Sequence, residues 1–218
     1  MNNKITVIMP VKNGKNYMEQ AIDSIKKQDV DLEIIVVDDG STDETAQIAG
    51  NLGCKVVSHE VNKGQVAAKN TGLKEASGNY IMFCDHDDLL EEGALKTMLA
   101  YFEKDPELMV VNSKISDFIS PDAANQAQTI KQEPYHGCLG GSMLIKKEVF
   151  DKIGLFDENV KAGEVIALTQ KFNEQNIKVL KIDFISSNRR IHDTNYGKTS
   201  KGSEFKDYAS ILRAKLRK

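Results

Sequence analysis

Short apolar runs alternate with helical patterns through the first half of the chain. Continuous apolar or β-branched runs predict strands that are covered on both faces, at residues 5–9, 34–37, 54–58, 80–84 and 108–112. Apolar residues at helical spacing predict helices between them, at residues 16–27, 45–52, 66–76 and 93–103. This alternation is typical of βαβ units on a parallel sheet, so we expect an α/β fold. Ligands of such sheets bind at the edge where the parallel strands end.

The second half of the chain is less regular. Residues 117–140 contain two prolines and few large apolar side chains, which predicts a long loop. Order returns at residues 142–145, with helices predicted near 147–153 and 164–173 and a strand at 178–185.

Composition narrows the class of protein. The chain has 218 residues, 40% of them hydrophobic and 28% charged, as expected for a globular domain. A net charge of −3 gives no reason to expect a nucleic-acid partner. Cys54, Cys84 and Cys138 are an odd number, which argues against a disulfide framework and favours a reducing cytoplasm. No apolar run approaches the ~20 residues of a membrane span, and no signal peptide is evident.

Acidic residues follow two of the predicted strands. Asp38 and Asp39 end the second, and Asp85-His86-Asp87-Asp88 ends the fourth. Carboxylates gathered at one edge repel each other, so they usually serve a cation or a hydrogen-bonding ligand. Acids in such turns also act as helix caps, and we assign Asp43 and Glu44 that role. For Asp85 and Asp87 we expect an oxygen-ligated ion completed by a phosphate ligand.

These motifs resemble family 2 glycosyltransferases. The similarity covers roughly the first 195 residues and rests on motifs in the family's order and spacing, at residues 9–14, 36–43, 62–64, 67–72, 85–88, 154–158 and 163–164. The resemblance implies a GT-A fold, a Rossmann-like α/β domain with a mixed central sheet. It also implies a domain over 1–195, with a nucleotide-sugar half at 1–112 and an acceptor half at 113–195. Residues 196–218 would form a basic tail.

The resemblance assigns roles to individual residues. A metal-assisted, inverting transfer from a nucleotide sugar, with UDP as the expected nucleotide, would use Mn²⁺ or Mg²⁺ to stabilise the leaving diphosphate. Asp87 would bind the metal, and Asp85 would contact the ribose or the metal's waters. His192 is a further candidate metal ligand. The resemblance places the nucleotide or donor against Pro10, Val11, Asn13, Asp38, Asp39, Lys69, Asp85 and His86.

Three positions depart from the family pattern. Lys12 stands where a tyrosine often stacks on the base, and Lys69 replaces an arginine, which keeps the charge but loses the planar fork. Where relatives carry Glu-Asp, with the Asp as catalytic base, this chain has Glu164-Val165. Either Glu164 takes the role of base, or another carboxylate does, or the chain is a weak or inactive transferase.

Other functions fit the motifs less well. A GT-A-like binding or scaffold protein that has lost catalysis is the main alternative, and Val165 is its motivation. A sugar nucleotidyltransferase needs a Gly-rich phosphate loop after the first strand, and a dehydrogenase needs G-x-G-x-x-G; neither is present. The chain has no Trp and no membrane span, unlike the processive synthases of the family. No motif in the sequence identifies the acceptor, which could be a glycan, a lipid-linked molecule or another hydroxyl compound.

Charge is unevenly divided along the chain. Residues 198–218 carry seven Lys and Arg against two acids, so the tail is +5 and the remainder −8. Residues 203–218 predict an amphipathic helix. It would pack on the domain, form a dimer contact, or bind an anionic membrane surface, which would place a cytoplasmic protein at the inner face of the membrane.

Overall fold

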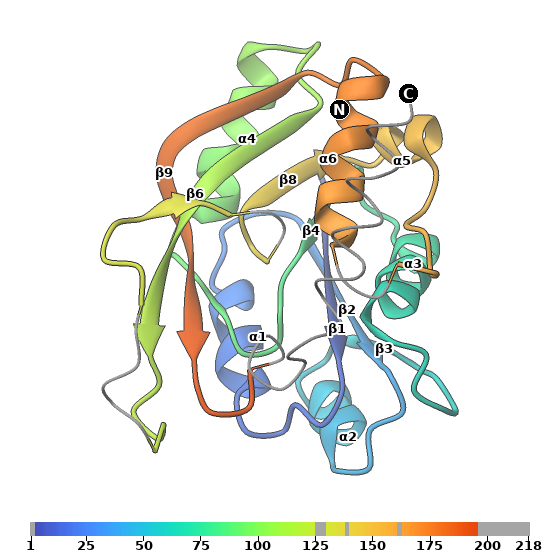
Figure 1. The fold of residues 1–218 in the computed structure, drawn as a ribbon, viewed down its shortest axis with the longest axis vertical. Coiled ribbons are helices and arrows are strands. Elements are labelled where there is room, and N and C mark those ends of the chain that lie inside the picture. Colours follow the sequence, from blue (N-terminus) through green and yellow to red (C-terminus); the bar gives the residue numbers. More distant parts are fainter. Residues whose placement is uncertain (1–2, 125–129, 138–139, 161–162, 196–218) are drawn as a thin grey trace.

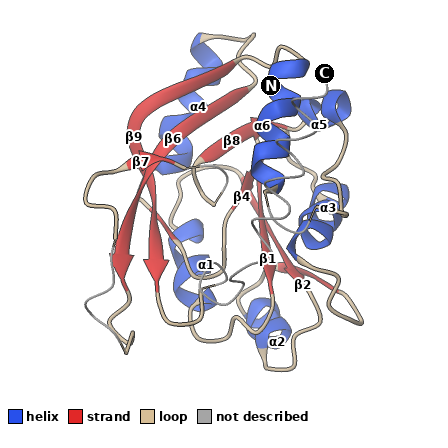
Figure 2. Cartoon of the chain, viewed as in Figure 1, coloured by secondary structure: helices blue, strands red, loops and turns tan. Residues whose placement is uncertain are grey.

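A single mixed sheet organises the molecule (Figures 1 and 2). The structure is a computed structural model that describes residues 3–124, 130–137, 140–160 and 163–195. Its nine strands run in the order β3-β2-β1-β4-β8-β6-β9-β5, with β7 beside β6. The strands are β1 (Ile5–Val11), β2 (Leu32–Asp38), β3 (Lys55–Ser58), β4 (Tyr80–Phe83), β5 (Leu89–Leu90), β6 (Val110–Ile119), β7 (Tyr135–His136), β8 (Met143–Lys146) and β9 (Val179–Ile191).

Helices cover both faces of this sheet. They are α1 (Met18–Lys26), α2 (Thr45–Asn51), α3 (Gln65–Glu75), α4 (Ala94–Lys104), α5 (Glu148–Ile153) and α6 (Glu164–Glu174). Side chains of α1, α2 and α4 join one hydrophobic cluster, and those of α3, α5 and α6 join a second. Successive residues of β4 alternate between the two, Met82 in the first and Phe83 in the second. Both faces are therefore buried, which explains the continuous apolar runs.

The mixed α/β architecture of the GT-A type is confirmed. Strands β3, β2, β1 and β4 are mutually parallel, so their carboxyl ends share one edge. Strand β8 then runs antiparallel to both β4 and β6, and β6 pairs in parallel with β9. This arrangement brings the carboxyl ends of β1, β2 and β4 to the same edge of the sheet as the carboxyl end of β9.

The predicted loop at 117–140 is partly wrong. Strand β6 continues to Ile119, and Tyr135–His136 form β7 against it. Strand β9 likewise extends to Ile191, six residues beyond the expected end. Both extensions pair with each other, Ile115 with Ser187 and Ile119 with Ile191. Polar residues within these segments hide the strand pattern, because the pairing joins residues about 70 apart in sequence rather than neighbours.

The basic tail at 196–218, with its predicted helix, and Cys138 lie outside the described residues.

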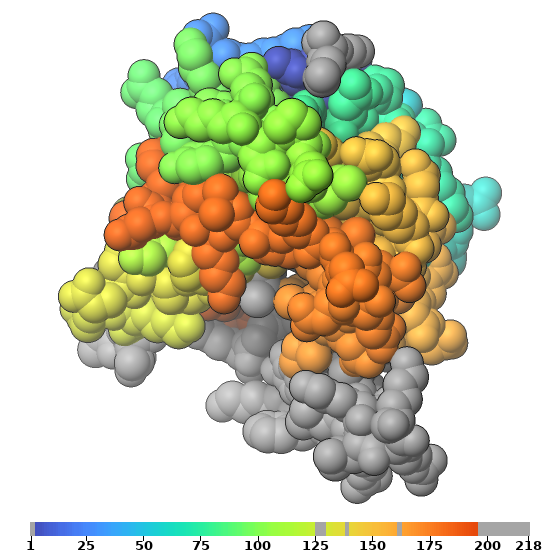
Figure 3. Space-filling model, turned by 90° about the horizontal axis from the view of Figure 1, so that it is seen from above, coloured from blue at the N-terminus to red at the C-terminus, as the bar shows by residue number. Residues whose placement is uncertain are grey.

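Seen from above, the surfaces of α6 and β9 in orange lie beside the green surface of α4 and β6 (Figure 3). Within the described ranges, no helix is long and apolar enough to cross a membrane.

We expect Gly→Ala substitutions at two helical positions to change the stability of the fold in opposite directions. A Cβ on Gly72 of α3 would lie 2.3 Å from Cγ2 of Ile8, a fully buried residue of β1. A Cβ on Gly50 of α2 would meet nothing within 4 Å. We expect Gly72→Ala to lower the free energy of unfolding by about 1–3 kcal/mol through overpacking. Gly50→Ala is expected to raise it by ~0.5–1 kcal/mol, because alanine favours the helix.

Urea denaturation of the two variants checks this prediction. Equal changes in the unfolding midpoint would show that α3 does not pack on β1 as closely as the structure indicates.

Candidate active site at the carboxyl edge of the sheet

The loops after β1 and β2 are tied to each other. Asn13 has a left-handed backbone, φ 54°, and its N–H donates to Ser41 Oγ at 2.8 Å. Its side-chain oxygen accepts from the N–H of Thr42 at 2.9 Å. Asp38 Oδ1 accepts from the N–H of Ser41 at 3.1 Å, which places this carboxylate as a support of the turn. The two loops form one wall of the edge.

Asp39 is buried and held by three hydrogen bonds. Its oxygens accept from the N–H groups of Lys63 and Gly64, each at 2.8 Å, in the loop before α3. Oδ1 also lies 2.8 Å from Nδ1 of His59. Pro10 and Val11 are buried in β1, and the Val11 carbonyl accepts the N–H of Asp39 at 2.8 Å. A carboxylate has about four lone-pair sites, so Asp39 keeps one for a ligand N–H.

Sequence reasoning assigned no role to His59. Its Nε2 lies 3.0 Å from Thr71 Oγ1 on α3, while Nδ1 holds Asp39. The signal that could have found it is its position directly after β3, at the same edge as the acids. His59 thus links the end of β3, the Asp39 carboxylate and α3.

Lys69 and Glu164 form an ion pair across the site. Lys69 Nζ, on α3, lies 2.7 Å from Glu164 Oε1, on the first turn of α6. The Lys69 side chain is 4% exposed and that of Glu164 13%. The helix begins after Gly163, whose φ of 87° allows the chain to turn. The two residues that sequence analysis assigned to donor and base are therefore in direct contact.

Val165 faces a different environment from Glu164. It is half-buried and packs against the second hydrophobic cluster, beside residues such as Leu168 and Phe172. A carboxylate at this position would be aimed partly into apolar surroundings. In this fold Glu164, and not position 165, is the residue of α6 that reaches Lys69.

The motif at 154–158 is anchored to α3. The side chain of Asn70 is buried and donates to the Phe156 carbonyl at 3.0 Å and to Glu158 Oε1 at 2.9 Å. Asn70 also accepts the Phe156 N–H at 3.0 Å. This loop precedes α6, so Asn70 and Lys69 both join α3 to the segment that carries Glu164.

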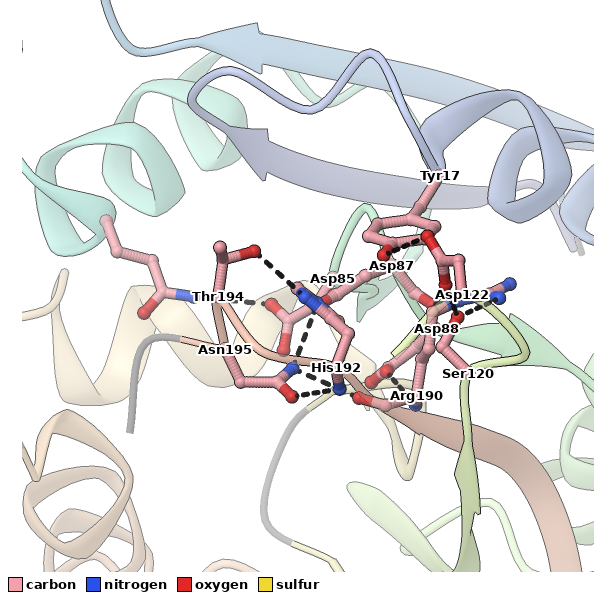
Figure 4. Close-up of polar contacts among 11 residues, drawn as sticks. Tyr17, Asp85, Asp87, Asp88, Ser120, Asp122, Arg190, His192, Thr194 and Asn195 are labelled. Carbon is pink, nitrogen blue, oxygen red and sulfur yellow. Dashed lines mark hydrogen bonds and ion pairs between the residues drawn. The ribbon is translucent and has the colours of Figure 1, made fainter. Parts of the chain in front are cut away.

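Asp87 meets His192 in the turn after β4 (Figure 4). Oδ2 of Asp87 lies 2.9 Å from Nε2 of His192, which follows β9, and 3.3 Å from Nδ2 of Asn195. Nδ1 of His192 lies 3.0 Å from Thr194 Oγ1. Asp85 instead accepts from Nε2 of Gln65 at 3.3 Å. The tertiary fold thus joins two candidate metal ligands that are 105 residues apart.

The three acids of this turn differ in their electrostatics. Burial opposes ionisation of Asp87, but the His192 hydrogen bond and the nearby His86 and His192 charges lower its pKa overall. Burial raises the pKa of Asp85, where Asp87 adds to the effect and Lys69 offsets part of it. Burial and the other two carboxylates hold the pKa of Asp88 well above its usual range. Of the three acids, Asp87 is the one whose ionised form the surroundings favour, relative to its ordinary pKa.

His86 packs against the loop after β1. It is half-buried and packs against Gly14, where an added Cβ would lie 2.8 Å from the His86 ring. Lys12 is exposed on the loop after β1. The His86 ring thus connects the turn after β4 to the loop after β1.

The side chains of Asp87 and His192 suit a divalent cation whose remaining ligands come from a substrate. A carboxylate and an imidazole are ligands that Mn²⁺ accepts. Within the described ranges, no group of three His, Cys, Asp or Glu side chains is arranged to hold a metal ion. Mg²⁺ and similar ions are often bound by one or two carboxylates together with substrate phosphates. Asp87 and His192 fit that mode of binding.

Comparisons with known proteins agree with this geometry. The model of the family "Glycosyl transferase family 2" matches residues 6–156. An uncharacterized glycosyltransferase of Rickettsia typhi is 30% identical over 98% of this chain and 72% of its own length. Glycosyltransferase GlyA of Streptococcus pneumoniae is 43% identical over 76% of this chain, which spans only 23% of that protein.

A solved structure supports the same assignment. The crystal structure of residues 1–349 of TarS from Staphylococcus aureus has a TM-score of 0.71 and 25% identity, covering 86% of this chain and 60% of that one. The family match includes Asp38, Asp39, Lys69 and the acids after β4. This chain belongs to glycosyltransferase family 2.

Proposed function

We propose that this chain transfers a sugar from a UDP-sugar to an acceptor hydroxyl, with inversion at the anomeric carbon and with the help of Mn²⁺ or Mg²⁺. The observation that carries the proposal is one edge where a buried carboxylate, a Lys–Glu pair and an Asp–His pair converge. TarS is named as a poly(ribitol-phosphate) β-N-acetylglucosaminyltransferase and has been solved with UDP and with UDP-GlcNAc. These names support a UDP-sugar as the donor.

Asp39 would recognise the nucleotide base. Three of its hydrogen-bonding positions are filled by protein groups, and the remaining one would accept a ring N–H. A uracil ring carries one such donor. Asp38 and Asn13 would act indirectly, by holding the loops against which the base lies.

Asp87 and His192 would hold the cation. When bound, a divalent cation neutralises charge on the leaving diphosphate as a Lewis acid. Mannosyltransferase PcManGT of Pyrobaculum calidifontis, solved with GDP-Man and Mn²⁺, has a TM-score of 0.70 and 19% identity over 96% of this chain and 64% of that chain. Asp85 would contact the ribose or waters of the cation, with Gln65 fixing its orientation.

Glu164 would act as the general base. Transfer requires a carboxylate that takes the proton from the attacking hydroxyl. The ammonium of Lys69 lies 2.7 Å from Glu164 Oε1 and fixes the orientation of this carboxylate. A diphosphate brought into the site would compete for Lys69, which would leave the Glu164 oxygens free to accept a proton. Lys69 would then serve the donor and the base in turn.

Substitution at position 165 tests this assignment. Val165→Asp restores the acid seen in relatives but buries part of a charge against apolar side chains, at a cost of about 1–3 kcal/mol in stability. We expect no gain in turnover, measured as UDP release, because Glu164 already supplies the base. Val165→Ala is the control for lost packing. A clear rise in turnover for Val165→Asp alone would move the role of base to position 165.

Donor binding and hydrolysis test the function as a whole. Calorimetry with UDP and GDP, each with MnCl₂ or EDTA, is expected to show binding of UDP that Mn²⁺ strengthens. A screen of UDP-sugars should then reveal slow UDP release, with the anomeric product followed by NMR. Failure to bind any nucleotide and to release UDP from any donor would favour the scaffold alternative, for which the comparisons provide no support.

A further inference from the structure

Arg190, near the end of β9, is a buried cation outside the groups considered so far. Its side chain is 4% exposed, although its neighbour Arg189 on the same strand is exposed. Burial of an arginine is costly unless its N–H groups are paired. Its guanidinium lies beside the Asp87–His192 pair, with Tyr17 and Ser120 close by (Figure 4).

Three guanidinium donors reach three different segments. Nε donates to the backbone carbonyl of Asp87 at 2.9 Å. One terminal nitrogen donates to Ser120 Oγ at 3.2 Å, and the other to Gln20 Oε1 at 2.7 Å. The turn after β4, the end of β6 and helix α1 are therefore fastened to one side chain.

Two aromatic rings lie against the guanidinium. Its central carbon lies 4.8 Å from the centre of the Tyr17 ring and 4.9 Å from that of Phe118. The Tyr17 ring also contacts the His192 ring, with centroids 4.7 Å apart. Its hydroxyl donates to Asp122 at 2.8 Å, which limits rotation of the ring. Arg190 and His192 thus share one aromatic neighbour.

The backbone of Arg190 joins the same network. Its N–H donates to Asp88 Oδ1 at 3.0 Å, and its carbonyl accepts from Asn195 Nδ2 at 3.0 Å. The same Asn195 nitrogen lies 3.3 Å from Asp87 Oδ2. The position of Arg190 therefore fixes the orientation of both residues of the pair. It acts on Asp87 through the backbone carbonyl of Asp87, and on His192 through Tyr17 and Asn195.

The geometry points to Arg190 as a positioning residue that holds Asp87 and His192 in register for a divalent cation. It does not reach the cation itself. Lysine could not replace it, because a single ammonium lacks the planar fork that makes these three hydrogen bonds and lies close to both rings. Groups that orient metal ligands typically contribute 10- to 100-fold to metal affinity. The inference rests on the proposed role of Asp87 and His192.

Calorimetry of UDP binding, with MnCl₂ or with EDTA, separates positioning from general damage. For Arg190→Lys we expect the strengthening by Mn²⁺ to fall about 10- to 100-fold. UDP binding in EDTA should stay within about twofold, because Asp39 and its loop do not contact Arg190. The matched control is Arg189→Lys, the same change one residue away on the exposed side, with wild-type behaviour expected. Added guanidinium should partly restore the effect of Mn²⁺ in Arg190→Ala.

Each outcome decides the inference. Thermal unfolding identifies variants that fail to fold. If Arg190→Lys fails to fold, Gln20→Met replaces it as the test: this change removes one acceptor of the guanidinium and should weaken the strengthening of UDP binding by Mn²⁺. Arg190→Lys that responds to Mn²⁺ like wild type overturns the inference and leaves the proposed function intact. Equal loss in Mn²⁺ and in EDTA overturns it too. A wild-type chain whose UDP binding ignores Mn²⁺ overturns both proposals.

Discussion

Glu164→Gln is expected to lower kcat by about 10²–10⁴, the usual cost of losing a general base. The amide cannot take a proton from the acceptor hydroxyl. Its oxygen can still accept a hydrogen bond from Lys69, so the buried ammonium keeps a partner and the fold should persist. KM for the donor should change much less than kcat. Initial rates of UDP release, measured at several donor concentrations, provide both constants.

Two further variants make this prediction sharper. Glu174→Gln makes the same change at an exposed position on the same helix and should leave kcat unchanged. Glu164→Ala removes the partner of Lys69 and leaves a buried charge, so it should lower stability as well as activity. A kcat for Glu164→Gln close to that of wild type would assign the base to another carboxylate.

Asp87→Asn is expected to lower kcat/KM by roughly 10³, because cation-assisted charge stabilisation supplies several kcal/mol. Asparagine has the same shape but lacks the negative charge that faces His192 and would bind the cation. UDP binding in EDTA should change little, while the strengthening by Mn²⁺ should disappear. Asp29→Asn, at an exposed carboxylate on the surface, serves as the control. Activity of Asp87→Asn that still rises with Mn²⁺ would remove Asp87 from the metal site.

Asp87 also predicts a pH dependence of stability. Its pKa in the folded chain is lower than its ordinary value, so the ionised carboxylate stabilises the fold above the unfolded-state pKa of about 4. That contribution is lost as the pH falls through the lowered pKa. In metal-free urea denaturation, wild type should therefore lose more stability than Asp87→Asn between neutral pH and about pH 3. Parallel curves for the two proteins would contradict the pKa shift.

Local patterns predicted the parts of the fold that depend on neighbours in sequence. The strands before Asp38 and Asp85 and the helices after them are present, because apolar periodicity and turn residues act over a few positions. The extensions of β6 and β9 were missed, since both depend on pairing between strands that are distant in sequence. The two-residue β5 was missed as well, as it depends on its pairing with β9.

The candidate site shows the same division. The pattern of strands placed Asp39, Asp85 and Asp87 at the sheet edge, since parallel strands must end together there. Lys69 was predicted from the family resemblance. The sequence also predicted His192 as a candidate metal ligand. The contact between His192 and Asp87, however, depends on how β9 curves back to the turn after β4.

By itself, the sequence determined the α/β class, the family and the acids at the sheet edge, because these follow from periodicity and short motifs. Only the tertiary structure decided which side chains work together. It paired Lys69 with Glu164, turned Val165 toward the apolar cluster, and brought His59 and Arg190 into the site. These contacts join segments up to 170 residues apart, and their geometry depends on packing and strand register, which no local pattern encodes.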